Sequence, residues 1–157
     1  MVKERVGLLG GSFDPVHLAH IALANAALYS LDLHQVQMVP AAQPWQKEQL
    51  GASALHRIAM LNLACKPYHH LVVNPIEIER GGPTYTYDTV SQLPSDKEYF
   101  WILGSDQLQN FTSWHHWQAI LDHVHLAVAK RPGATLHAPA ELQNYLQSQN
   151  KVLHHID

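Results

Sequence analysis

The stretch that decides the fold runs from Val6 to His20 and reads Val-Gly-Leu-Leu-Gly-Gly-Ser-Phe-Asp-Pro-Val-His-Leu-Ala-His. Its first four residues predict a short apolar strand, which runs into the glycine pair Gly10 and Gly11. After the Asp-Pro turn the pattern predicts a helix, with His17 and His20 three positions apart and therefore on one side of its first turn. The stretch thus predicts a strand, a glycine turn and a helix end that carries two imidazoles.

A junction of this kind is suited to binding a phosphate. Glycines let the backbone approach a ligand where a Cβ atom would clash. The first turn of a helix has N–H groups without intrahelical partners and a partial positive charge from the helix dipole, and such ends bind phosphate groups. We therefore interpret this stretch as a polyphosphate site.

Other readings of the stretch fit less well. The spacing of Gly7, Gly10 and Gly11 does not give the dinucleotide fingerprint G-x-G-x-x-G, and no Gly-Lys-Ser/Thr follows to make a P-loop. The histidine pair is a possible metal site, but no cysteine or third close ligand accompanies it. We expect no protein-held metal there.

Residues 10–20, GGSFDPVHLAH, resemble the G-G-[ST]-F-D-P-x-H-x-G-H signature of nucleotidyltransferases, and specifically of bacterial nicotinate-nucleotide adenylyltransferases. One residue departs from this signature, because Ala19 stands where the family usually has glycine. The resemblance implies that His17 and His20 act catalytically on the phosphates of ATP. It also implies nucleotide binding by the turn residues Gly10, Gly11, Ser12 and Phe13.

Apolar segments alternate with helical segments along the chain. The predicted strands are residues 6–9, 36–39, 71–74, 98–103, 125–129 and 152–156, and residues 76–79 alternate like an edge strand or an extension. Helices are predicted at 18–29, from an N-cap at Ser53 to Cys65, near 84–88, in a broken form over 106–120 and at about 138–149. In the second of these helices we expect Leu55, Ile58, Ala59 and Leu63 to point inward. This alternation predicts an α/β fold, a Rossmann-like doubly wound parallel sheet of about five to six strands. Ligands of such sheets lie beyond the carboxyl ends of the strands, where the strand order reverses.

A second motif follows the strand at 98–103. Gly104-Ser-Asp106-Gln-Leu108, with Phe111 and Trp114 after it, resembles the family's G-x-D-x-L…F…W segment. The resemblance implies that Gly104 and Asp106 bind nucleotide and that Trp114, with His115 beside it, borders the nicotinate ring. A cationic pyridine ring favours such an aromatic face. Asp106 as a helix N-cap and Trp114 as a core residue remain alternatives.

Residues 83–86, Pro-Thr-Tyr-Thr, resemble the family's P-S-Y-T segment, which implies that Thr86 binds the nicotinate carboxylate. As an alternative, Thr86 caps the short helix. Two cations are also implied by resemblance: Lys47, as a catalytic residue in the loop after the second strand, and Arg131, as a nucleotide-binding residue in Lys-Arg-Pro-Gly133. Lys47 as a solvated charge is the alternative, and Arg57 is a further cation near the strand ends.

The overall composition fits one domain over residues 1–157. The net charge of −3 does not favour a nucleic-acid partner, and the absence of an 18-residue apolar run predicts no membrane span. With one cysteine, Cys65, and no visible signal peptide, we expect a cytoplasmic protein. The family's I-S-[AS]-T-x-I-R segment does not occur, so we expect a domain that is incomplete at its C-terminus. Oligomeric state stays open.

The function that these motifs predict is transfer of AMP from ATP to nicotinate mononucleotide. In the family, the phosphate of the substrate attacks the α-phosphorus in line, with Mg²⁺ bridging the ATP oxygens and no covalent enzyme intermediate. Two alternatives remain: a pantetheine-phosphate adenylyltransferase, and a nucleotide-binding remnant without activity. The missing tail and Ala19 favour the second of these.

Overall fold

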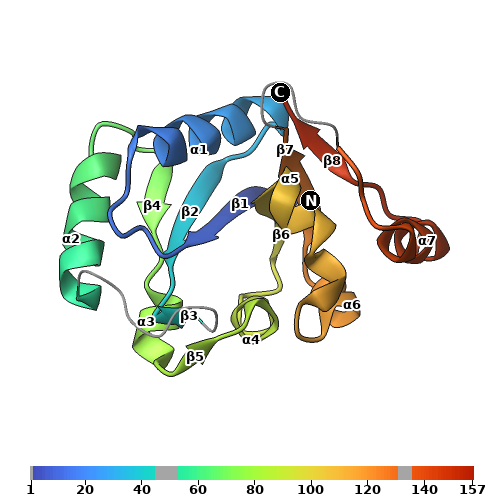
Figure 1. Cartoon of the computed structure of the whole chain (residues 1–157). Helices are drawn as coiled ribbons and strands as arrows, with labels where there is room; N and C mark the ends of the chain where they lie inside the picture. Colours follow the sequence, from blue (N-terminus) through green and yellow to red (C-terminus); the bar gives the residue numbers. More distant parts are fainter. Residues whose placement is uncertain (1, 45–52, 131–135) are drawn as a thin grey trace.

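The computed structural model describes residues 2–44, 53–130 and 136–157. Its centre is a parallel sheet with the strand order β4-β2-β1-β6-β7-β8 (Figure 1). The strands of this sheet are β1 (Glu4–Gly11), β2 (Gln35–Pro40), β4 (Leu71–Val73), β6 (Lys97–Gly104), β7 (His125–Ala129) and β8 (His154–Ile156). A second, two-stranded sheet joins β3 (Gln43–Pro44) to β5 (Pro83–Thr84).

Helical segments connect these strands. They are α1 (Leu18–Ser30), α2 (Ala54–Cys65), α3 (Ile76–Arg80), α4 (Thr86–Val90), α5 (Ser105–Gln109), η1 (Phe111–Ser113), α6 (Trp117–Ile120) and α7 (Ala140–Ser148). The chain leaves β1 toward β2 and β4 on one side, and then returns to β6 on the other side of β1. The strand order therefore reverses between β1 and β6, and a ligand is expected at the carboxyl ends of these two strands. The predicted fold class is confirmed.

The sheet has an apolar core on each face. Alternate residues of β1 divide between them: Leu8 belongs to one core cluster and Leu9 to the other, as the two-residue period of a strand requires. The cluster with Leu9 contains the buried apolar residues of α1 and α2, whereas the cluster with Leu8 contains those of α4, α5, α6 and α7. Covered on both faces, the central strands β1, β6 and β7 have continuous buried runs in their middle.

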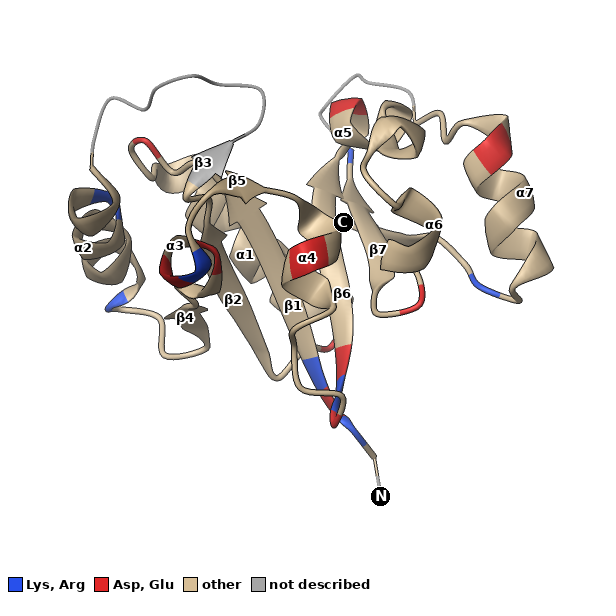
Figure 2. Ribbon diagram, turned by 90° about the horizontal axis from the view of Figure 1, so that it is seen from below, with Lys and Arg blue, Asp and Glu red and all other residues tan. Residues whose placement is uncertain are grey.

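Ion pairs tie the amino ends of the central strands together. Arg5 of β1 contacts Glu98 of β6 at 3.0 Å, and Lys97 contacts Glu4 at 2.9 Å. The ring of His125 in β7 lies 3.0 Å from the second carboxylate oxygen of Glu98. Figure 2 shows these opposite charges together near the N-terminus. The carboxyl ends of the same strands are left to form the site.

Most predicted elements are confirmed to within a few residues, but residues 76–79 are not a strand. They form the helix α3, and the prediction of an edge strand was wrong because Ile-Glu-Ile-Glu also fits a short helix that buries Glu77. The predicted cap of α2 is confirmed: the Ser53 hydroxyl accepts a hydrogen bond from the backbone N–H of His56 at 3.2 Å.

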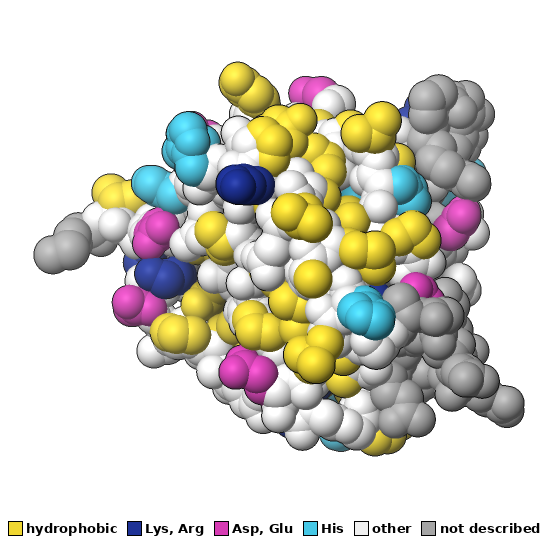
Figure 3. Space-filling model, turned by 90° about the vertical axis from the view of Figure 1, so that its left-hand side faces the viewer, with side chains coloured by type: hydrophobic (Ala, Val, Ile, Leu, Met, Phe, Trp, Pro, Cys, Tyr) yellow, Lys and Arg dark blue, Asp and Glu magenta, His cyan; other side chains and the backbone are white. Residues whose placement is uncertain are grey.

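The buried face of α2 also differs from the expected one. Leu55 and Leu63, expected to point inward, are 79% and 71% exposed, while Arg57, Leu61 and Cys65 are buried. Figure 3 looks onto the side of the molecule that carries α2, where apolar side chains lie among polar ones. Across the described ranges, no helix combines the length and the apolarity that crossing a lipid bilayer demands.

Candidate active site

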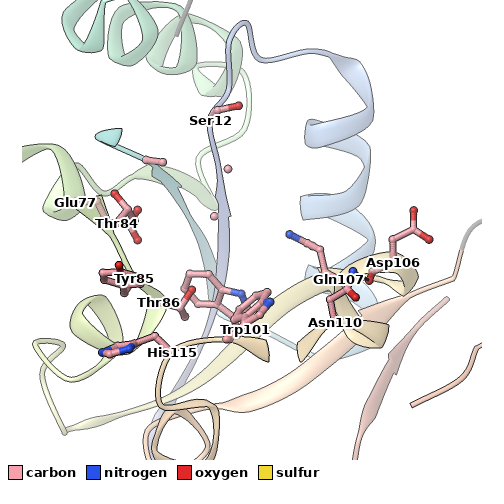
Figure 4. Close-up of a pocket in the computed structure, with 14 residues that line it drawn as sticks. Ser12, Glu77, Thr84, Tyr85, Thr86, Trp101, Asp106, Gln107, Asn110 and His115 are labelled. Atoms are coloured by element: carbon pink, nitrogen blue, oxygen red, sulfur yellow. Dashed lines mark hydrogen bonds between the residues drawn. The ribbon is translucent and has the colours of Figure 1, made fainter. Parts of the chain in front are cut away.

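A pocket of about 440 Å³ lies at the carboxyl ends of β1 and β6 (Figure 4). Gly10, Gly11 and Ser12, at the end of β1, line one side of it. Another side is formed by α5 and the residue after it, with the polar side chains Asp106, Gln107 and Asn110. The pocket therefore occupies the position that the strand order predicts.

Residues predicted to surround a nicotinate ring share one wall of this pocket. Thr86, Trp114 and His115 all line it, although they come from α4 and from the turn after η1. The ring of His115 lies against that of Tyr85, with centroids 4.7 Å apart, and Trp114 packs on Phe111 at 4.9 Å. Thr86 is the first residue of α4 and Tyr85 is its N-cap, so the alternative role of Thr86 as the cap is wrong.

Trp101 is a pocket residue that the sequence reasoning missed. It lies in the middle of β6 and is only 5% exposed, yet it lines the pocket beside Gly10. Trp101 pairs with Leu8 of β1, and its indole extends along the strand to Gly10, where a Cβ atom would lie 2.9 Å from it. Gly10 is thus needed to admit the indole, in addition to any role in ligand approach.

We expect Gly10→Ala to destabilise the fold by about 1–3 kcal/mol, because the added methyl group would force Trp101 to move. Gly11→Ala is the matched control, since a Cβ atom there meets the Phe13 ring at an ordinary 3.5 Å. Urea unfolding of both variants measures the difference. Equal unfolding midpoints would contradict the packing argument.

The histidine pair begins α1, immediately beyond the glycine turn. The two rings are neighbours, with centroids 3.9 Å apart, so the predicted common side of the helix is confirmed. His17 is the N-cap residue and is exposed, while His20 is half-buried. Neither ring is part of the wall of the 440 Å³ pocket, which ends at Ser12 on this side. The phosphate-binding role of the pair therefore stays a prediction.

The hydrogen bond of His20 determines which nitrogen of its neutral ring carries the proton. Its Nδ1 accepts the backbone N–H of His17 at 3.0 Å, which leaves the proton of the neutral ring on Nε2. Burial and, next, the neighbouring His17 lower the pKa of His20 from its ordinary value. At neutral pH the ring is therefore a neutral N–H donor, which suits an oxygen of a phosphate.

Phe13 and Ala19 lie differently from what their motif suggests. The Phe13 ring is 2% exposed and meets the His20 ring edge-on at 4.9 Å, so only its main chain is available to a nucleotide. The ring therefore belongs to the core, and nucleotide binding by the main chain of Phe13 stays a prediction. Ala19 is exposed on the first turn of α1, and its methyl group does not disturb the packing there.

Arg57 connects two loops that carry pocket residues. Arg57 is buried, 1% exposed, and its guanidinium donates to the carbonyl oxygens of Ser12 at 2.9 Å and Ala41 at 2.6 Å. Burial lowers the pKa of Arg57, while the charge of Asp14 raises it. Arg57 thus joins the chain after β1 to the chain after β2, and both Ser12 and Ala41 line the pocket.

Other predicted residues are placed as follows. Asp106 lines the pocket from the first turn of α5, and the N-cap of that helix is Gly104, so the alternative of Asp106 as the cap is wrong. Gly104 does not itself line the pocket; its N–H donates to the Gln107 side chain at 3.1 Å. Lys47 and Arg131 lie outside the described residues.

The strand order, the glycine turn and the pocket together define a nucleotide-binding α/β protein of the nucleotidyltransferase class. Comparison of the sequence agrees, because the model of the cytidylyltransferase-like family matches residues 8–153. The chain is 60% identical over 150 residues to a probable nicotinate-nucleotide adenylyltransferase of Bordetella petrii, covering 96% of this chain and 77% of the relative. A protein of the same description from Bordetella parapertussis is 57% identical over 156 residues, covering 99% and 79%.

The chain therefore belongs to the cytidylyltransferase-like family and, within it, to the nicotinate-nucleotide adenylyltransferases. A solved structure of the Plasmodium falciparum nicotinic acid mononucleotide adenylyltransferase, complexed with NaAD, has the same fold. It superposes with a TM-score of 0.76 at 20% identity and covers 98% of this chain and 75% of that one.

Proposed function

We propose that this chain transfers the AMP group of ATP to nicotinate mononucleotide, giving nicotinate adenine dinucleotide and pyrophosphate. The observation that carries the proposal is that a single pocket at the strand reversal is lined by both predicted motifs, the glycine turn and the Thr86–His115 wall. The close relatives named as enzymes of this reaction support it.

In the proposed reaction a phosphate oxygen of the mononucleotide attacks the α-phosphorus of ATP, and the bond to pyrophosphate breaks. The electron pair leaves with the pyrophosphate oxygen, so the protein supplies no nucleophile. Its contribution is positioning and stabilisation of charge on the transferred group. We assign this stabilisation to the N–H groups at the start of α1 and to the Nε2–H of His20, with His17 beside it.

Mg²⁺ is assigned to the phosphates of ATP. This ion keeps several waters and is commonly held by substrate phosphates with one or two carboxylates. The described part of the chain has no group of three or more His, Cys, Asp or Glu side chains placed to hold a metal. Lys47 and Arg131 remain the proposed cations for the phosphates, and the other end of the pocket, with Thr86, Trp114 and His115, is assigned to the nicotinate ring.

The test is to incubate the purified chain with ATP, Mg²⁺ and, in parallel, nicotinate mononucleotide or phosphopantetheine, and to identify the products by mass spectrometry. The proposal predicts the nicotinate dinucleotide, with one pyrophosphate for each dinucleotide. An adenylylated phosphopantetheine as the main product would favour the pantetheine enzyme instead. Binding of ATP without pyrophosphate release would identify an inactive remnant.

A further inference from the structure

Glu77 is a buried carboxyl group on the pocket wall to which the proposed reaction gives no role. It belongs to α3, is 3% exposed, and lines the pocket together with Thr84, Tyr85 and Thr86. Figure 4 shows its carboxyl group on the same side of the pocket as these three residues, away from Asp106 and Gln107. A carboxyl group here stands at the end of the pocket assigned to the pyridine ring.

The bond that holds Glu77 leaves one of its oxygens for another partner. The hydroxyl of Thr89, in α4, donates to Oε2 at 2.7 Å, and Arg80 in turn donates to that hydroxyl oxygen at 3.2 Å. Because the single hydroxyl hydrogen of Thr89 goes to Oε2, the other oxygen, Oε1, can carry a proton or accept one. Glu77 is thus fixed in place but free to exist in two protonation states.

The surroundings of Glu77 contain little opposing charge. The charged group that acts on it is Arg80, from its own helix. The strand β2, which packs against α3, has no titratable side chain. The helix α4 carries the titratable side chains Tyr87 and Asp88. The pocket lining adds Tyr85, His115 and Asp106. Burial raises the pKa of Glu77 to about 7, against the Thr89 hydrogen bond and the charge of Arg80, which lower it.

Building on the proposed function, we propose that Glu77 contacts the substituent of the pyridine ring and distinguishes a carboxylate from an amide. When the acid mononucleotide binds, Glu77 takes up a proton from solvent and donates it in a hydrogen bond to the nicotinate carboxylate. When the amide mononucleotide is present, ionised Glu77 accepts a hydrogen bond from its NH₂ group. The physical reason is that two carboxylates cannot share this wall while both are charged, whereas an amide brings its own donor.

This inference makes the choice between acid and amide depend on pH. Below about pH 7 Glu77 is largely neutral, and the acid form binds without repulsion. Above that pH the proton must be taken up, so the affinity for the acid form falls by at most about tenfold for each pH unit. Both mononucleotides carry the same phosphate, so the ratio of the two affinities cancels the titration of that group.

The test is calorimetric binding of both mononucleotides between about pH 6 and 8.5, in buffers of different ionisation heat. Proteins to compare are the full chain, Glu77→Gln, Thr89→Val and the control Glu79→Gln, which removes an exposed charge from the same helix. In the wild-type chain we expect the acid-to-amide affinity ratio to fall by roughly 30-fold or more across this range, with proton uptake on binding the acid. Glu79→Gln should behave like the wild type, and Glu77→Gln should give a flat ratio without uptake.

Thr89→Val tests whether the pKa of Glu77 sets the pH at which the affinity ratio falls. Without the hydroxyl that lowers the pKa of Glu77, the fall in the ratio should move to higher pH. If Glu77→Gln does not fold, this shift in Thr89→Val is the test of the role of Glu77, and an unchanged pH dependence would overturn that role. A ratio that is independent of pH in the wild type, or unchanged in Glu77→Gln, would overturn the inference while dinucleotide formation still supported the proposed function. If neither mononucleotide binds at any pH, both fail.

Discussion

Replacing His20 with alanine is expected to lower kcat by about 10²–10³-fold, because it removes the neutral Nε2–H donor that we assign to the phosphates of ATP. The donor exists because Nδ1 accepts the N–H of His17, and because burial lowers the pKa of the ring. The measurement is the rate of pyrophosphate release at saturating ATP and mononucleotide. Turnover close to that of the wild type would contradict the assignment.

A second variant separates catalysis from helix structure. His20 also caps the start of α1, so alanine removes a hydrogen bond as well as a donor. Glutamine at this position has an oxygen able to accept the same N–H, as Gln does in a capping box. We expect His20→Gln to keep the melting temperature of the wild type and to lose turnover like His20→Ala. Recovery of turnover in His20→Gln would show that the helix start, and not the imidazole, matters.

Removing the guanidinium of Arg57 is expected to give the largest loss of stability. Arg57→Met leaves the Ser12 and Ala41 carbonyl oxygens without their buried donor. A buried carbonyl oxygen left without its donor typically costs about 1–3 kcal/mol, so we expect a loss of about 2–6 kcal/mol for the two together. For a chain of this size, that is a fall in Tm of roughly 10 °C, which differential scanning calorimetry would detect.

Two further variants show whether the loss of stability comes from the hydrogen bonds of Arg57 to Ser12 and Ala41. Lys66→Met removes a cation that is exposed at the end of α2 and should change the unfolding free energy by less than about 1 kcal/mol. Arg57→Lys keeps the charge but lacks the planar fork of donors, so we expect an intermediate stability and a raised KM for ATP, since Ser12 lines the pocket. If Arg57→Met unfolded at the same temperature as Lys66→Met, the hydrogen bonds of Arg57 would contribute nothing measurable to the unfolding free energy.

The sequence predicts the sheet well because each strand is a short apolar run between turn signals. The bounds predicted for β7 are those observed, His125–Ala129, and the cap at Ser53 is in place. Motifs that follow strand ends meet at one edge of a parallel sheet, which is why Thr86, Trp114 and His115 could be expected to share a wall.

What the sequence does not reveal depends on partners distant along the chain. Arg57 of α2 is buried because two carbonyl oxygens from loops distant in the sequence accept its hydrogen bonds. The local sequence pattern gives no sign of these partners. In the same way, Glu77 is buried because Thr89 on another helix donates to it. Both are charged residues at buried positions, where periodicity leads one to expect apolar residues. For this reason the buried face predicted for α2 was wrong, and α3 was predicted as a strand.

The central claim is that this pocket brings two anionic substrates together and that no side chain forms a covalent bond to the transferred group. The stereochemistry at the α-phosphorus tests it most directly. With an ATP analogue that is chiral at that phosphorus, a single in-line displacement gives a dinucleotide of inverted configuration. We predict inversion. Retention would require two displacements, and hence a covalent intermediate on the protein, and would contradict the account.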